Sequence, residues 1–129
     1  MSEKRTILVV DDEEAIRELF ITLGKHDFFE FPVEVLVARN PEEAKKIFLA
    51  NLKEISLVIT DINLASSRYG QGWEIINFVS GFVGIKVAAM TGNDENLPAL
   101  KERGIPYLEK PSSVQTIQKI INDLLRTDE

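Results

Sequence analysis

Five residues whose side chains could take part in catalysis or metal binding follow the ends of short apolar runs in this sequence. Asp11 and Asp12 follow "ILVV", Asp61 follows "LVIT", Thr91 follows "VAAM", and Lys110 follows "YLE". If these runs are neighbouring strands, three carboxylates, one hydroxyl and one ammonium meet at the same edge of a sheet. Carboxylates that are held together repel one another, and a divalent cation would relieve that repulsion.

Each of these residues also has an ordinary explanation when it is taken alone. Asp11 and Asp12 could stabilise the start of the next helix, Thr91 is typical of a turn, and Lys110 is typical of a solvated surface. Nothing in folding requires three carboxylates at one place, so their combination favours a site. The chain has no cysteine and one histidine, and oxygen ligands alone favour magnesium, manganese or calcium.

Apolar runs alternate with amphipathic stretches along the whole chain. The runs predict strands over 6–12, 33–40, 55–61, 85–92 and 105–110. The spacing of apolar residues predicts helices over 13–24, 41–48, 73–80, 94–104 and 112–126. Strands that alternate with helices indicate an α/β fold, with a parallel sheet covered by helices on both faces. Near-continuous apolar strands agree with this arrangement, because both of their faces are buried.

The bulk composition limits the possible classes of protein. A chain of 129 residues with 44% apolar residues fits one domain over 1–129, with its core at about 5–126. The net charge of −6 argues against a direct nucleic-acid surface. No apolar run approaches the roughly 18 residues that span a membrane, and no signal peptide is visible. We therefore expect a cytoplasmic protein without a membrane partner.

Four motifs give the sequence a specific resemblance. With "LVVDDEE", "LVITDIN", "AAMTG" and "YLEKP" in this order, the chain resembles the receiver domain of two-component response regulators of the chemotaxis-regulator kind. The resemblance covers about residues 5–126. It implies a flavodoxin-like, doubly wound, five-stranded parallel sheet with strand order 2-1-3-4-5.

The resemblance also implies roles for the residues at the strand ends. Asp61 corresponds to the phosphoacceptor, and Asp11, Asp12 and Asp61 correspond to carboxylates around Mg²⁺, with Mn²⁺ as a possible substitute. The backbone carbonyl of Asn63 would also reach this metal. Lys110 would pair with the phosphoryl group, whose negative charge must be neutralised during transfer.

Two further positions match the family's conformational switch. Thr91 would offer its hydroxyl to a phosphoryl oxygen, and Tyr107, three residues before Lys110, occupies the aromatic switch position. The implied protein is a phosphorelay signalling switch that catalyses its own phosphorylation and dephosphorylation, and not an enzyme for an outside substrate. Its partners would be a sensor histidine kinase or histidine phosphotransfer protein and an unknown downstream protein.

The loop after Asp61 departs from the family pattern. In "INLASSRYGQGWE", Ala65 stands where a proline is typical, and Gly72 comes about three residues later than usual. We favour a tolerated surface insertion over 64–72. The sharper hypothesis is that Arg68 or Tyr69 gates access to Asp61 or contacts a partner.

Two other stretches carry expectations. Pro98 predicts that the helix within 94–104 is short or irregular, with Leu97 and Leu100 as buried anchors. The phenylalanines of "FFEF" over 28–31 are expected to pack in the core.

Other functions share parts of these motifs. A degenerate receiver that binds partners without phosphorylation would lack the residues that this chain retains. A phosphatase of the haloacid dehalogenase type needs a second aspartate two positions after the nucleophile, where this chain has Asn63. A flavin-binding module would need a hydroxyl-rich phosphate loop after the first strand, and "DDEE" would repel that phosphate.

Overall fold

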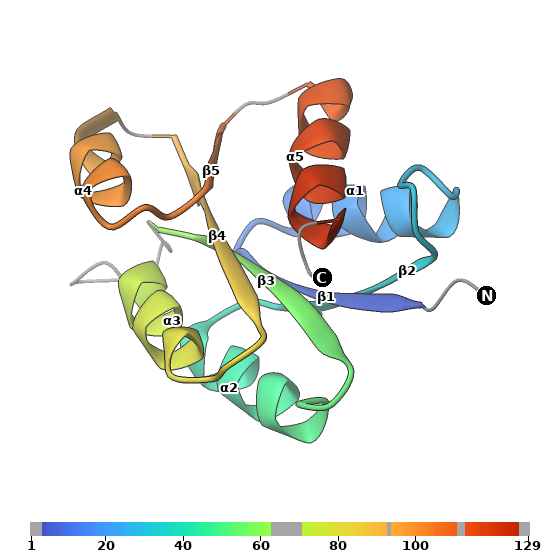
Figure 1. Cartoon of the computed structure of the whole chain (residues 1–129), viewed down its shortest axis with the longest axis horizontal. Coiled ribbons are helices and arrows are strands. Elements are labelled where there is room, and N and C mark those ends of the chain that lie inside the picture. The colour runs from blue at the N-terminus through green and yellow to red at the C-terminus, as the bar shows by residue number, and fades with distance from the viewer. Residues whose placement is uncertain (1–3, 63–70, 93, 111–112, 127–129) are drawn as a thin grey trace.

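The computed structural model describes residues 4–62, 71–92, 94–110 and 113–126. Five parallel strands form one sheet with the order β2-β1-β3-β4-β5, as Figure 1 shows. The strands are β1 (Arg5–Val10), β2 (Val33–Ala38), β3 (Ile55–Asp61), β4 (Lys86–Thr91) and β5 (Tyr107–Glu109). The predicted fold class and strand order are confirmed.

Helices cover both faces of this sheet. They are α1 (Glu14–Lys25), α2 (Pro41–Ala50), α3 (Gln71–Ser80), the short 3₁₀ helix η1 (Asp94–Asn96), α4 (Leu97–Glu102) and α5 (Val114–Arg126). In Figure 1, α1 and α5 lie on one side of the sheet, and α2 and α3 lie on the other. None of the helices within the described residues is long and apolar enough to cross a membrane.

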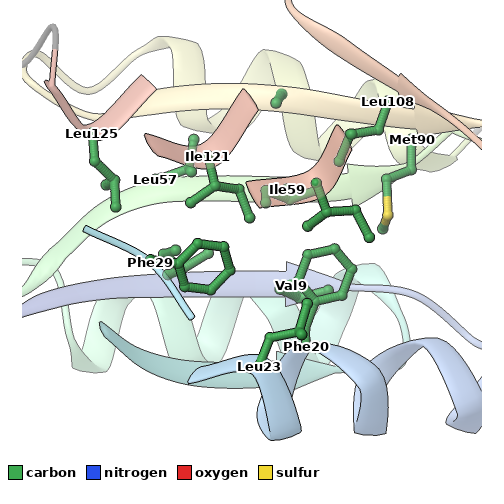
Figure 2. Packing of buried hydrophobic residues seen from close by; sticks show 13 residues of the cluster. Val9, Phe20, Leu23, Phe29, Leu57, Ile59, Met90, Leu108, Ile121 and Leu125 are labelled. Carbon is green, nitrogen blue, oxygen red and sulfur yellow. The ribbon is translucent and has the colours of Figure 1, made fainter. Parts of the chain in front are cut away.

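Alternate residues of each strand serve two separate cores, because successive strand side chains point to opposite faces. Val9 and Ile59 belong to the first cluster, which lies under α1 and α5. Figure 2 shows Phe20 of α1 and Ile121 of α5 in the space between the two helices, beside these strand residues. The phenylalanines of "FFEF" also pack on this cluster, as predicted.

The opposite face carries a second and a third cluster. Leu8, Val10 and Val58 pack with residues of α2 and α3 in the second. The third cluster lies toward α3 and α4, and its buried members are Ile62, Ile76, Ala89 and Leu100. Trp73, Leu97 and Tyr107 pack against it.

Local sequence signals explain most helix ends. Asn40 caps α2, because its Oδ1 accepts a hydrogen bond of 2.8 Å from the Glu43 amide, and Pro41 follows as the first helical residue. The helix within 94–104 is confirmed as short: α4 has six residues, and Pro98 lies in its first turn. Leu100 is fully buried, as expected.

The end of α1 corrects one expectation. Gly24 was expected to stop this helix, but α1 continues to Lys25. A Cβ atom on Gly24 would meet Val35 Cγ2 at 3.0 Å, so this glycine allows α1 to lie close to β2.

Candidate active site: three carboxylates and a lysine

Four parallel strands bring the predicted site residues to one edge of the sheet. Asp61 ends β3 and is paired in register with Met90, while Thr91 ends β4. The Asp11 amide donates a hydrogen bond of 3.0 Å to the Ala38 carbonyl, which extends the β1–β2 ladder by one residue. The Lys110 amide likewise donates to the Thr91 carbonyl at 2.7 Å.

Asp11, Asp61 and Lys110 lie on the same side of this edge. Each of them follows by two positions a strand residue of the first core cluster, namely Val9, Ile59 and Leu108. Their side chains therefore meet on the α1–α5 side of the sheet.

The ammonium of Lys110 contacts three carboxylates. Its Nζ lies 2.8 Å from Asp11 Oδ2, 3.0 Å from Asp61 Oδ2 and 3.0 Å from Glu13 Oε1. The Lys110 side chain is 19% exposed, and Asp11 is fully buried. Burial alone would lower the pKa of Lys110, but its contacts with Asp11, Glu13 and Asp61 outweigh burial and raise the pKa above its usual value. Lys110 therefore remains charged.

The acidic residues of the site outnumber this cation. Asp11, Asp12 and Asp61 each offer one carboxylate oxygen, and these oxygens all lie within 4.8 Å of one another. Among the described residues, Asp11 Oδ2 is buried without a hydrogen bond, although Lys110 lies beside it. A buried carboxylate oxygen in this position fits a divalent cation, and three oxygen donors suit magnesium.

Glu13, the residue just before α1, and Arg17 of α1 orient Asp11, and sequence reasoning missed both. The Glu13 amide donates a hydrogen bond of 2.8 Å to Asp11 Oδ1, so that Oδ2 is left to face the cluster. Arg17 Nη1 donates to the Asp11 carbonyl oxygen at 2.8 Å. The acid-rich stretch "DDEE" was the available signal for Glu13, whereas nothing local signalled Arg17, which reaches back from within α1 to the Asp11 carbonyl.

Thr91 is bonded through its side chain to the segment that follows β4. It is 2% exposed, and its Oγ1 accepts a hydrogen bond of 3.0 Å from Asn96 Nδ2. Tyr107, paired in register with Ala89, is half-buried against the third core cluster. Tyr107 therefore lies on the same side of the sheet as Ala89, which precedes Thr91 by two residues in β4.

Three predicted residues lie outside the described residues, namely Asn63, Arg68 and Tyr69. Their proposed contributions, a metal-binding carbonyl and a loop gate, remain predictions. The residues on either side of this gap are described: the Ile62 amide donates to the Met90 carbonyl at 2.9 Å, and the Gly72 amide donates to the Ile62 carbonyl at 3.2 Å.

Comparison with known proteins finds similar solved structures but no match to a family model or to a curated sequence. A response regulator receiver domain protein from Clostridium thermocellum has 29% identity and a TM-score of 0.74, with 95% of each chain covered.

Two further solved structures extend this likeness. The response regulator protein TrrA from Thermotoga maritima, solved in complex with Mg²⁺-BeF, has 26% identity and a TM-score of 0.76, covering 93% of this chain and 98% of its own. The signal receiver domain of an HD domain-containing protein from Pseudomonas fluorescens Pf-5 has a TM-score of 0.78 at 22% identity, with 98% of each chain covered, and this likeness supports the fold alone. With its strand order and its cluster of three aspartates, the chain therefore has the receiver-domain fold of two-component response regulators over nearly its whole length.

Proposed function

We propose that the chain is a phosphoacceptor receiver that takes a phosphoryl group from a phosphohistidine onto Asp61. The observation that carries this proposal is the setting of Asp61. Its carboxylate ends a buried strand, lies 3.0 Å from the Lys110 ammonium, and shares a cluster with Asp11 and Asp12. An aspartate that served only as a helix cap would not need this surrounding charge.

The transfer joins two negatively charged groups, so the site must lower their repulsion. An Asp61 oxygen would form a bond to phosphorus while the bond from phosphorus to the donor imidazole nitrogen breaks. The imidazole keeps the electron pair and takes a proton from solvent. Lys110 would neutralise charge on a phosphoryl oxygen, and positioning with electrostatic stabilisation would account for the acceleration.

The carboxylates of Asp11, Asp12 and Asp61 would hold Mg²⁺, and Mn²⁺ could replace it. When bound, this ion would neutralise the phosphoryl oxygens and the aspartates together. The buried Asp11 Oδ2 supports this assignment, as does the Mg²⁺-BeF complex of the similar TrrA protein. The backbone carbonyl of Asn63 completes the proposed ligand set.

The phosphorylated form would act as a signal and be reset by water. Hydrolysis of the acyl phosphate would return the Asp61 carboxylate and inorganic phosphate. While the phosphoryl group is present, new hydrogen bonds from Thr91 would favour a second conformation, which Tyr107 could follow. The donor would be a sensor histidine kinase or a histidine phosphotransfer protein, and the output would be contact with a downstream protein.

The direct test is incubation with Mg²⁺ and acetyl phosphate, followed by intact-mass measurement. A single phosphate adduct that is lost in Asp61→Asn and when Mg²⁺ is chelated is the expected result. No adduct with any donor, including a phosphorylated cognate kinase, would contradict the proposal. That outcome would instead favour a degenerate receiver that works as a phosphorylation-independent binding module.

A further inference from the structure

Asn96 ends the 3₁₀ helix η1 and directly precedes α4. An asparagine that caps a helix has an extended backbone, and its side-chain oxygen accepts a hydrogen bond from an amide of the first turn. Asn96 has helical backbone angles, φ −83° and ψ −16°, and its described side chain makes no capping hydrogen bond. Its side-chain nitrogen Nδ2 donates a hydrogen bond of 3.0 Å to Thr91 Oγ1 instead. The side chain therefore serves Thr91 and not its own helix.

This hydrogen bond holds Thr91 on the side of the sheet away from the carboxylates. Thr91 follows Ala89 by two positions, and Ala89 belongs to the cluster beside α3 and α4. Asp61 follows Ile59, which belongs to the cluster beneath α1 and α5. Because strand side chains alternate, the Thr91 hydroxyl must turn toward the edge to reach a group on Asp61. The bond to Asn96 opposes that movement.

The same residue connects Thr91 to α4 and, through α4, to α3. Leu100 of α4 is fully buried in the third cluster. Beyond the end of α4, Arg103 Nη2 donates a hydrogen bond of 2.8 Å to Asn77 Oδ1, and its guanidinium carbon lies 5.1 Å from the centre of the Trp73 ring. A shift at the start of α4 would thus reach the environment of Trp73.

We infer that Asn96 is a positioning residue that holds the Thr91 hydroxyl in its resting orientation and ties α4 to the phosphoryl site. This inference rests on the proposed function. Phosphorylation of Asp61 would draw the hydroxyl away, break the hydrogen bond, and free the first turn of α4 to move. A ligand that requires the released state binds more tightly when the resting state is weakened.

Beryllofluoride with Mg²⁺, a mimic of the phosphoryl group, is the probe for the role of the Asn96–Thr91 hydrogen bond. Trp73 is the single tryptophan of the chain, so its fluorescence can follow the titration. Asn96→Leu removes the hydrogen bond with little change in side-chain size. Losing one such bond is expected to raise the apparent affinity for beryllofluoride about two- to tenfold. In a Thr91→Val background, the same substitution should leave the affinity unchanged.

The control and the alternatives separate positioning from a purely structural role. Asn51→Leu is the matched control, because it removes a side-chain Nδ2 that donates to the Ile47 carbonyl at the end of α2. This variant should keep the wild-type affinity for beryllofluoride. If Asn96→Leu does not fold, Asn96→Ala replaces it, with a melting curve for each variant. An unchanged or weakened affinity in Asn96→Leu, or an equal change in the Thr91→Val background, would overturn the inference. A wild-type protein that binds no beryllofluoride and accepts no phosphate would instead overturn the proposed function on which it rests.

Discussion

Gly72 packs directly against the backbone of Asp61. A Cβ atom on Gly72 would lie 2.0 Å from the Asp61 carbonyl oxygen and 2.5 Å from Ile62 Cα. The Gly72 amide also donates to the Ile62 carbonyl at 3.2 Å. Since only a glycine permits this approach, the start of α3 is fitted onto the strand end that carries the proposed phosphoacceptor.

Gly72→Ala should therefore damage both stability and phosphorylation. The added methyl group cannot be accommodated unless α3 moves away from β3, and overpacking of this kind costs about 1–3 kcal/mol. Urea denaturation should show this loss in the free energy of unfolding. The folded variant should also accept phosphate from acetyl phosphate more slowly, because the Asp61 backbone is displaced.

Gly81, just after the other end of α3, provides the matched control. A Cβ atom there would meet only the Phe78 carbonyl oxygen, at an ordinary contact distance of 3.5 Å. Gly81→Ala is expected to change the free energy of unfolding by less than about 0.5 kcal/mol. Similar losses in Gly72→Ala and Gly81→Ala would contradict the proposed close packing.

Lys110→Met is expected to bind Mg²⁺ more tightly than the wild-type protein. The ammonium lies within 3.0 Å of both Asp11 and Asp61, where it repels an incoming divalent cation. Removing one such charge at a partly buried site should increase the affinity roughly tenfold. Isothermal titration calorimetry with Mg²⁺ measures this directly, while transfer from acetyl phosphate should fall because Lys110 no longer contacts the phosphoryl group.

Lys45→Met is the control for removal of a lysine charge. Lys45 of α2 pairs with Glu74 of α3, on the face of the sheet opposite α1 and α5 (Figure 1). Its Mg²⁺ affinity should equal that of the wild-type protein. Unchanged or weaker Mg²⁺ binding in Lys110→Met would mean that the lysine and the cation do not compete for the same carboxylates.

The raised pKa of Lys110 predicts a particular dependence of stability on pH. The folded pKa lies above the unfolded value of about 10.4, so the stabilisation by Lys110 is complete below that value and is lost as pH rises through the folded pKa. Denaturation between about pH 9 and 12 should thus show a steeper alkaline loss of stability in wild type than in Lys110→Met. Parallel curves would show that Lys110 gains no proton affinity on folding.

The sequence was sufficient to predict the sheet and most of the charged site. Continuous apolar strands and the alternation of strands with helices identify a parallel sheet, and parallel strands must bring their carboxyl ends together. The approach of Asp11, Asp61 and Lys110 follows from that geometry. Asn40 and Pro41 likewise predict the start of α2, because the capping contact spans only three residues.

The contacts that could not be predicted depend on the position of one element relative to another. The helix over 13–24 was predicted to stop at Gly24, yet a glycine is needed at this position because α1 lies close to Val35 of β2. The Asn96 side chain, on the predicted helix over 94–104, donates a hydrogen bond to Thr91 of the preceding strand. Asn122, a polar residue on the predicted helix over 112–126, is buried against a segment 92 residues earlier in the chain. Helical spacing alone contains no information about such partners.

Asn122 gives a last prediction, about how the loop before β2 is held. Asn122 is 7% exposed, and its Oδ1 accepts a hydrogen bond of 2.9 Å from the Glu30 amide. Asn122→Ala should lower the free energy of unfolding by about 1–2 kcal/mol and speed hydrogen exchange at the Glu30 amide. Lys119→Ala, at an exposed position of the same helix, should change stability by less than about 0.5 kcal/mol. If Glu30 exchanges at the same rate in both variants, the loop does not depend on Asn122, because an amide that loses the acceptor holding it must open more often.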